Sequence, residues 1–382
     1  MSGIYLHVPF CRTACHYCDF HFSTSLNNVD AYVDAVIKEI QIRSGQTLWS
    51  SSVFHTLYLG GGTPSVLSVE QTLSILSALN SSLSTEGSWA EATIEVNPED
   101  VSVESLQGWL RCGVDRISIG VQSFDDEQLQ WMNRKHSAKE AVAAIQLARS
   151  EGFKKISIDL IYGLAHRSEG SWKKTIEKAF SLPIDHISCY VLTVEPRTVL
   201  GARIKKGLEK EAPDELIEKD YSELCAFAKE NSFLHYEVSS WAKDVNNKAI
   251  HNTSYWEGVP YLGLGPGAHG FDGENRYSLV SNNNKYIQEI GLGSLPEQIE
   301  KLSSLDRSNE ILMTGLRTSK GVDFNELKRV WGVDHIAENL VAWERWVEVG
   351  AIVPSKEGRH RISEKFWLVG DSISADLISV QS

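Results

Sequence analysis

Strand-like and helix-like segments alternate through the first half of this 382-residue chain. Between short β-rich runs lie longer stretches in which apolar residues recur every three or four positions, as Tyr32, Val36 and Ile40 do. This alternation predicts an α/β fold with a parallel sheet and right-handed crossovers, in an incomplete (β/α) barrel of six units or a doubly wound sheet. The predicted strands are 4–8, 56–59, 93–96, 116–121, 155–161 and 186–192, and the predicted helices are 31–43, 68–83, 101–111, 138–149 and 171–180.

The pattern changes after residue 196, and the length allows two or three domains. Residues 201–235 are charged and helical in pattern, whereas 236–295 are rich in Gly, Asn, Tyr and Trp and are expected to be irregular. Helices at 308–316, 325–331 and 336–347, followed by short strands at 352–354 and 359–362, resemble a small α+β winged-helix module. We therefore expect a barrel over 1–200, an extension with an irregular aromatic segment over 201–300, and a winged-helix-like domain over 301–382.

The charge balance argues against a nucleic-acid partner. Lys and Arg number 37 and Asp and Glu number 50, which gives a net charge of −13. Asp334, Glu338 and Glu344 interrupt the predicted C-terminal helices, so no basic recognition helix is expected.

The chain has no apolar run of the roughly 18–20 residues that span a bilayer, and its first residues lack the pattern of a signal peptide. These features predict a cytoplasmic protein without a transmembrane segment.

Three of the six cysteines lie within eight residues, as Cys11, Cys15 and Cys18. In a reducing compartment such a group indicates metal ligation or catalysis rather than disulfides. Three thiolates on one loop suit an iron–sulfur cluster and leave the fourth iron open to a small molecule. A zinc site with His16 as a fourth ligand is the alternative. The position of the loop, directly after the first predicted strand, favours the cluster.

Several segments, taken in order, resemble one family of proteins. Tyr5-Leu-His-Val-Pro-Phe-Cys11 with Cys15-His-Tyr-Cys18-Asp-Phe20 is similar to the opening of the oxygen-independent coproporphyrinogen III oxidase family of radical S-adenosylmethionine (SAM) proteins. This resemblance implies a TIM-like partial barrel, a 4Fe-4S cluster and bound SAM, from which one electron releases a deoxyadenosyl radical. The later matching segments are Leu59-Gly-Gly-Gly-Thr-Pro64, Glu95-Val-Asn-Pro98, Ser118-Ile-Gly-Val-Gln122, Asp159-Leu-Ile-Tyr-Gly163 and Tyr261-Leu-Gly-Leu-Gly265.

The resemblance also implies a set of SAM-binding residues. Read alone, the glycine run could be a tight turn and each polar residue could be a solvated loop residue; a nucleotide P-loop is not indicated, because no Gly-Lys-Ser/Thr follows. Within the family pattern, the Gly-Gly-Thr segment meets the amino-acid end of SAM, an arginine can hold a carboxylate, and two tyrosines flank the ligand. The implied residues are Tyr5, Tyr17, Gly61, Gly62, Thr63, Glu95, Gln122, Arg134 and Asp159. Whether the chain holds one SAM or two is left open.

The segment His251-Asn-Thr-Ser-Tyr255-Trp256 resembles a signature of the haem-chaperone (HemW-type) branch of this family. The resemblance implies that His251 ligates haem iron and that Tyr255 and Trp256 stack on the porphyrin. The alternative is a packed loop in which the histidine makes an ordinary hydrogen bond. The ligand, and whether attachment is covalent, stay open.

One local difference separates the branches. Oxidases of the family carry a further cysteine two places after the third, where this chain has Phe20, and an extension before the cysteine loop, which here begins at residue 11. We therefore expect a chaperone that binds haem as cargo and passes it to haem-accepting proteins, which could include respiratory ones, as a monomer or a reversible dimer. The alternative is the oxidase activity itself, the oxidative decarboxylation of coproporphyrinogen III to protoporphyrinogen IX.

Overall fold

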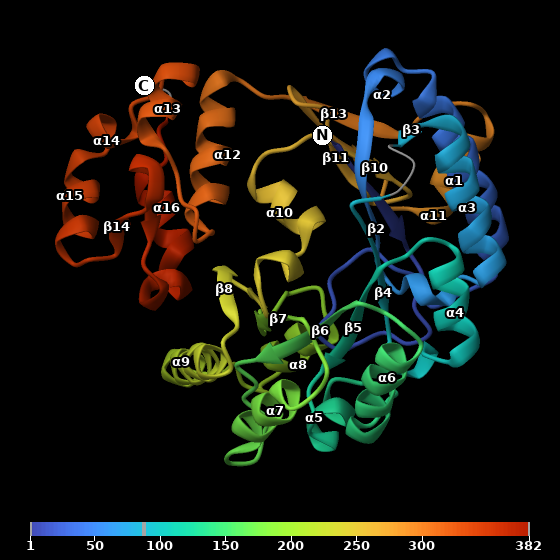
Figure 1. Ribbon diagram of the computed structural model, residues 1–382, viewed down its shortest axis with the longest axis horizontal. Coiled ribbons are helices and arrows are strands. Elements are labelled where there is room, and N and C mark those ends of the chain that lie inside the picture. Colours follow the sequence, from blue (N-terminus) through green and yellow to red (C-terminus); the bar gives the residue numbers. More distant parts are fainter. Residues whose placement is uncertain (1, 86–88, 381–382) are drawn as a thin grey trace.

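A computed structural model describes residues 2–85 and 89–380 of the chain. Six parallel strands lie side by side in sequence order at the centre of one large sheet (Figure 1). Each successive pair is joined by a helical crossover, which confirms the predicted α/β class and the parallel sheet. The strands are β1 (Ser2–Val8), β2 (Val53–Gly61), β4 (Glu91–Val96), β5 (Arg116–Gln122), β6 (Lys155–Tyr162) and β7 (His186–Val191), and the two-residue β3 (Ser84–Thr85) pairs with β2.

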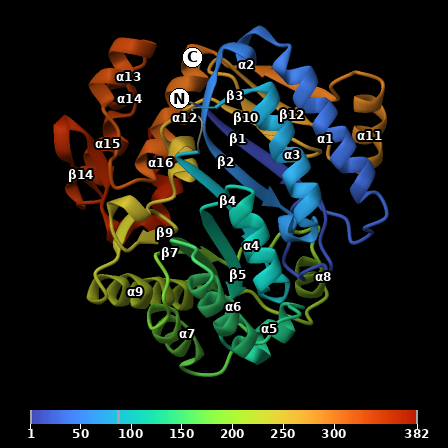
Figure 2. The ribbon, with the colours of Figure 1, turned by 45° about the vertical axis from the view of Figure 1, so that its right-hand side comes forward.

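Helices cover the outer face of this sheet, as the turned view in Figure 2 shows. Ile156, Ile158 and Leu160 of β6 are buried on the face toward these helices, and Ser157 and Asp159 alternate with them on the opposite face. The side chain of Ser68 caps the second long helix in a capping box with Gln71. The helices are α1 (Val29–Ser44), α2 (Thr47–Ser51), α3 (Val69–Ser82), α4 (Val103–Arg111), α5 (Asp126–Trp131), α6 (Ala138–Ser150) and α7 (Ser171–Phe180).

The segment 236–295 was expected to be irregular, and that prediction is wrong. It supplies short strands that extend both edges of the sheet, and two helices. Its glycines mark close packing: a Cβ on Gly263 would lie 1.9 Å from the His269 carbonyl oxygen. On one edge lie β10 (Tyr261–Leu264), parallel to β1, then β11 (His269–Phe271), β12 (Asn275–Leu279) and β13 (Glu297–Lys301); on the other lie β9 (Ser240–Ala242) and β8 (Leu234–Glu237).

The two end strands of this path, β13 and β8, do not pair with each other within the described residues, so the sheet is an open, incomplete barrel. Further helices flank the added strands. They are α8 (Val199–Lys205), α9 (Asp214–Glu230), α10 (Ile250–Trp256) and α11 (Asn283–Gly291). A 3-10 turn at Val245–Asn247 precedes α10, and two others, at Pro64–Val66 and Pro98–Asp100, follow β2 and β4.

Residues 304–377 form a separate group of helices with a small hairpin, which we call the C-terminal unit (Figure 1). The expected helices and small hairpin are present, but the helix expected over 336–347 is divided at Asn339, which has φ −123° and ends the first piece. The elements are α12 (Ser304–Leu316), α13 (Phe324–Trp331), α14 (His335–Glu338), α15 (Leu340–Glu348), β14 (Ile352–Pro354), β15 (His360–Ile362) and α16 (Gly370–Leu377), with 3-10 turns at Lys356–Gly358 and Glu364–Val369.

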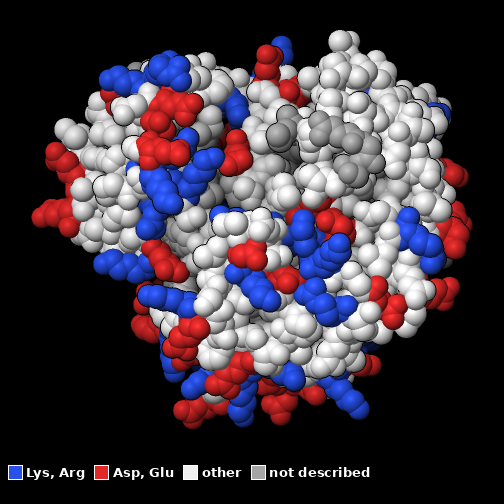
Figure 3. Space-filling view, in the orientation of Figure 1, with Lys and Arg blue, Asp and Glu red and all other residues white. Residues whose placement is uncertain are grey.

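Surface charge and helix length bear on possible partners. On the face drawn in Figure 3, basic and acidic side chains are interspersed rather than gathered by sign. Across residues 2–85 and 89–380, no helix combines the length and the apolar character needed to cross a membrane.

Candidate functional site

The cysteine loop leaves the carboxyl end of β1 and is tied to its surroundings by backbone hydrogen bonds. The Cys11 amide donates to the Ser23 carbonyl (3.0 Å), which closes the base of the loop. The Asn133 side chain donates to the Ala14 carbonyl (2.7 Å), and Asn133 has a left-handed φ of +63° that lets the chain turn there. The loop is thus held in place from both sides.

A cavity of about 550 Å³ lies at the carboxyl ends of the parallel strands, where the cysteine loop faces them. Cys11, Cys15 and Cys18 all line it. Eight of the nine residues implied for SAM binding line it too: Tyr17, Gly61, Gly62, Thr63, Glu95, Gln122, Arg134 and Asp159. The parallel sheet explains this convergence, since the ends of its strands meet at one edge although they are far apart in sequence.

The surroundings of the thiols suit an iron–sulfur ligand set. Thr63 Oγ1 donates to Cys11 Sγ (3.3 Å), and Arg134 Nη1 donates to Cys15 Sγ (3.4 Å). Burial raises the pKa of the Cys11 thiol to about 11, and the hydrogen bond from Thr63 acts in the opposite direction. Donors aimed at sulfur stabilise the thiolate that binds metal.

His16, the fourth ligand of the alternative zinc site, is engaged elsewhere. Its Nδ1 donates to the Trp131 carbonyl (2.8 Å), and its backbone amide donates to the Met132 carbonyl (3.2 Å). His16 is not among the residues that line the cavity. The geometry therefore favours the three-thiolate cluster over zinc.

The Arg134 guanidinium is only partly hydrogen-bonded within the described residues. Its Nη2 donates to Asn97 Oδ1 (2.6 Å) and to the Gly120 carbonyl (2.7 Å). Its Nε is buried and has no hydrogen-bond partner among the described residues. A buried guanidinium nitrogen without a partner is costly, so this residue fits a site whose ligand carries a carboxylate.

Two buried carboxylates face the same cavity. Glu95 accepts hydrogen bonds from the Tyr58 hydroxyl (2.6 Å) and the Gly61 amide (3.2 Å), and burial nevertheless raises its pKa to about 7. Asp159 accepts from the Ser118 hydroxyl (3.2 Å), and burial raises its pKa to about 6. Both groups would be stabilised by a ligand that offers ammonium or hydroxyl donors.

The glycine segment is close-packed against the cysteine loop. A Cβ on Gly62 would lie 2.7 Å from the Phe10 carbonyl oxygen and 2.9 Å from that of Val8. Gly61 has φ +110°, which side chains rarely permit. Gln122, at the end of β5, also has a positive φ of +66°, a strained conformation for a non-glycine residue and typical of functional sites.

Tyr5 is the one SAM candidate that the structure keeps out of the cavity lining. Its ring stacks 6.1 Å from that of Tyr58, which does line the cavity, and its hydroxyl lies 3.1 Å from His7 Nδ1. Sequence reasoning did not single out Tyr58, Asn97 or Ser118. Asn97 and Ser118 lie inside matched segments and could have been found there, whereas Tyr58 lies just before one.

The three haem candidates lie on α10, but they face different surroundings. His251 is fully buried; its Nδ1 lies 2.9 Å from Thr56 Oγ1 and its Nε2 lies 2.8 Å from the Tyr255 hydroxyl. Its ring stacks 5.2 Å from Tyr58, and burial lowers its pKa to about 3. In this conformation both ring nitrogens are occupied, so His251 could ligate iron only after releasing a hydroxyl partner.

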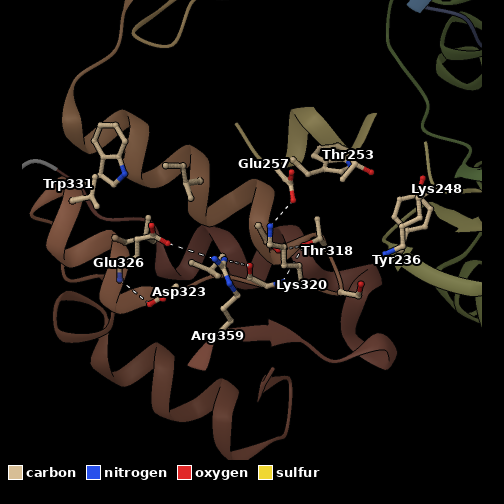
Figure 4. A pocket seen from close by; sticks show the side chains of 18 residues that line it. Tyr236, Lys248, Thr253, Glu257, Thr318, Lys320, Asp323, Glu326, Trp331 and Arg359 are labelled. Carbon is tan, nitrogen blue, oxygen red and sulfur yellow. Dashed lines mark hydrogen bonds and ion pairs between the residues drawn. The ribbon is translucent and has the colours of Figure 1, made fainter. Parts of the chain in front are cut away.

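Trp256 lies on the other side of α10 and lines a second cavity of about 420 Å³, between α10 and the helices α12 and α13 (Figure 4). Its Nε1 is buried and has no partner among the described residues. Trp331 closes the cavity on the α13 side. Lys320, which forms an ion pair with Glu257 (2.7 Å), lies between Trp331 and α10. The further lining includes Ile311, Leu327, Val330, Lys248 and Arg359.

Comparison with known proteins agrees with this geometry. Residues 5–179 match the Radical SAM superfamily. A Bacillus subtilis protein named heme chaperone HemW is 33% identical over 87% of both chains, and the Haemophilus influenzae protein of the same name is 30% identical over 90% of this chain and 93% of its own.

A solved structure shares the fold. Coproporphyrinogen III oxidase (HemN) from Escherichia coli, described as a radical SAM enzyme, superposes with a TM-score of 0.84 at 23% identity, covering 99% of this chain and 90% of that one. At this identity the superposition establishes the fold alone. The sequence matches and the cysteine-lined cavity together place this chain in the radical SAM superfamily and, within it, in the family of the proteins named heme chaperone HemW.

Proposed function

We propose that this protein is a haem chaperone: it binds haem and transfers it to acceptor haem proteins, and it also binds a 4Fe-4S cluster and SAM. The observation that carries the proposal is the position of α10, which lies between the cysteine-lined cavity, here called the SAM cavity, and a second, partly apolar cavity. The relatives' name supports it. We further propose that the protein acts in the cytoplasm and that its acceptors include respiratory haem proteins.

Cys11, Cys15 and Cys18 would hold three irons of the cluster, and SAM would chelate the fourth. When bound, such a cluster can supply one electron to the sulfonium of SAM. Arg134 would use its free Nε to hold the carboxylate of SAM, since its other donors are already engaged. Glu95 and Asp159 would accept hydrogen bonds from the ammonium or ribose groups.

Haem would lie against α10 in the second cavity. Trp256 and Trp331 offer flat apolar walls for a porphyrin, and Lys248, Lys320 and Arg359 offer cations for its propionates. His251 would contribute through its hydrogen bond with Thr56 of β2, which holds the helix to the sheet. A chaperone must also release its cargo, and stacking without a strong axial ligand suits release.

Phe20 argues against the oxidase. It occupies the position of the additional cysteine, lines the SAM cavity and is 72% exposed. A phenyl ring can neither donate a proton nor bind a metal, so it cannot supply the chemistry of a thiol at this position.

The test is an anaerobic turnover assay on the protein with a reconstituted cluster, given SAM, a reductant and coproporphyrinogen III. We expect no protoporphyrinogen, and about one haem bound per chain by titration. Trp256→Ala should weaken haem binding at least tenfold by loss of a stacking wall. Leu292→Ala, on an exposed side chain away from both cavities, is the control. Many turnovers per chain would establish the oxidase and refute the chaperone proposal.

A further inference from the structure

A second group of metal-binding side chains lies far from the cysteine loop. Cys225 on α9, His235 on β8 and Glu364, which begins a 3-10 turn of the C-terminal unit, bring their potential ligand atoms within 4.8 Å of one another. None of the three lines either cavity. We propose that they bind a divalent transition-metal ion of the zinc class.

His235 is oriented as a metal ligand would be. Its Nε2 lies 3.4 Å from the Val238 carbonyl oxygen, and a proton on Nε2 leaves the lone pair on Nδ1. Nδ1 in turn faces both Cys225 Sγ (3.9 Å) and Glu364 Oε1 (2.5 Å). Histidine ligands commonly donate their second N–H to a backbone carbonyl in this way, which fixes the ring for coordination.

Two tryptophans hold the imidazole still. Trp241 stacks on it at 4.0 Å, and Trp367 meets it edge-on at 4.3 Å. The His235 side chain is only 7% exposed, so its rotation is blocked by packing. A ligand fixed before the metal arrives loses little conformational entropy on binding.

The distances suit a tetrahedral ion after a small movement of one side chain. Zinc bonds of about 2.3 Å to sulfur and about 2.1 Å to nitrogen place those two atoms about 3.6 Å apart, close to the 3.9 Å observed. The contact between Glu364 and His235 would lengthen by about 1 Å to reach a tetrahedral separation. Glu364 is half-exposed and free to make that movement, and water could fill the fourth position.

The donor set selects the class of metal. A thiolate with an imidazole and a carboxylate suits zinc and similar ions, whereas magnesium and calcium prefer oxygen ligands alone. Without metal, His235 and Glu364 form a hydrogen bond beside a thiol. The metal would replace the proton shared by that pair and the proton of Cys225.

The site would join two parts of the molecule. Cys225 and His235 belong to the elements at one edge of the large sheet, whereas Glu364 belongs to the C-terminal unit. A bound ion would therefore clamp that unit onto the sheet edge at β8, and it would raise the midpoint temperature of unfolding.

The test uses the full-length chain with its cluster reconstituted, dialysed against Zn²⁺ and then against metal-free buffer. We expect about one zinc per chain, with a single sulfur in the zinc coordination shell by X-ray absorption. Cys225→Ser and Glu364→Gln should each weaken zinc binding at least tenfold while the iron content stays unchanged. Cys112→Ser, which alters a half-buried cysteine elsewhere, should bind zinc as the unaltered chain does.

Three outcomes would overturn the proposal. They are an unaltered chain that retains no zinc, a zinc shell with three sulfurs, which would place the ion in the cysteine loop, and equal zinc binding by all variants. If Cys225→Ser fails to fold, Glu364→Gln still decides the matter, because its side chain is half-exposed and glutamine keeps its size. Zinc should raise the unfolding temperature of the unaltered chain but not that of Glu364→Gln.

Discussion

The buried ion pair between Arg116 and Glu91 anchors the helix that carries the haem candidates. Both side chains are almost completely buried, and Arg116 Nε donates to Glu91 Oε2 at 2.9 Å. The other oxygen of Glu91 accepts the backbone N–H of His251 (3.0 Å). Ala249, at the start of α10, has no side chain that can cap the helix, so Glu91 supplies this acceptor from β4.

Arg116 also holds the segment before the helix. Its Nη2 donates to the carbonyls of Asn247 (2.9 Å) and Lys248 (3.0 Å). Arg116→Met removes these bonds and leaves the Glu91 carboxylate buried without its nearest cation. Breaking a buried ion pair in this way costs about 3–5 kcal/mol of unfolding free energy. The loss of the two hydrogen bonds to backbone carbonyls places the expected cost in the upper part of that range. We therefore expect a loss of about 4 kcal/mol in the free energy of unfolding.

The assay is urea denaturation of the unaltered chain, Arg116→Met and the double variant Glu91→Leu/Arg116→Met. The double variant should recover at least half of the loss, because no unpaired charge remains buried. Lys320→Met, at an exposed ion pair with Glu257, is the matched control and should cost less than about 1 kcal/mol. Hydrogen exchange at the His251 amide should quicken in Arg116→Met. The reasoning would be refuted if Arg116→Met lost no more free energy of unfolding than Lys320→Met and if hydrogen exchange at the His251 amide were unchanged.

Three further predictions concern the SAM cavity. Arg134→Lys should keep its charge but lose the Nε donor that would hold the SAM carboxylate, so SAM affinity should fall at least tenfold in equilibrium binding while iron content is retained. Gly62→Ala should push on the backbone of the cysteine loop and at least halve the iron bound on reconstitution, whereas Gly291→Ala, with nothing within 4 Å of the added Cβ, should bind iron normally. Burial raises the pKa of Glu95 from 4.5 to about 7, so the folded state holds this proton more tightly than the unfolded state does. The stability of the ligand-free chain relative to Glu95→Gln should therefore fall by about 3 kcal/mol between pH 4.5 and pH 7, as urea denaturation can measure; a constant difference would contradict the shift.

Much of the fold could be predicted from the sequence, because the apolar patterns that indicate strands and helices are local and recur along the chain. In the central strands, apolar residues that pack against the helices alternate with residues of the opposite face, as Ile117, Ile119 and Val121 do in β5, and segments with helical periodicity bound the strands. The strands at the sheet edges, such as Ser240–Ala242 and His269–Phe271, have three residues each, too few to show alternation. The division of the expected 336–347 helix at Asn339 was likewise invisible, because apolar periodicity continues across the break.

The sequence by itself determined the local chemistry: three thiols spaced for one cluster, glycines that let two backbones touch, and a phenylalanine where a further cysteine would stand. These depend on covalent spacing and on residue type, and both are written in the chain. Only the tertiary structure decided which distant groups meet. It brought Tyr58 to Glu95, left Tyr5 outside the cavity, occupied both nitrogens of His251 and joined Cys225 to Glu364. The physical reason is that such meetings depend on the register and curvature of the sheet and on how the C-terminal unit packs against its edge.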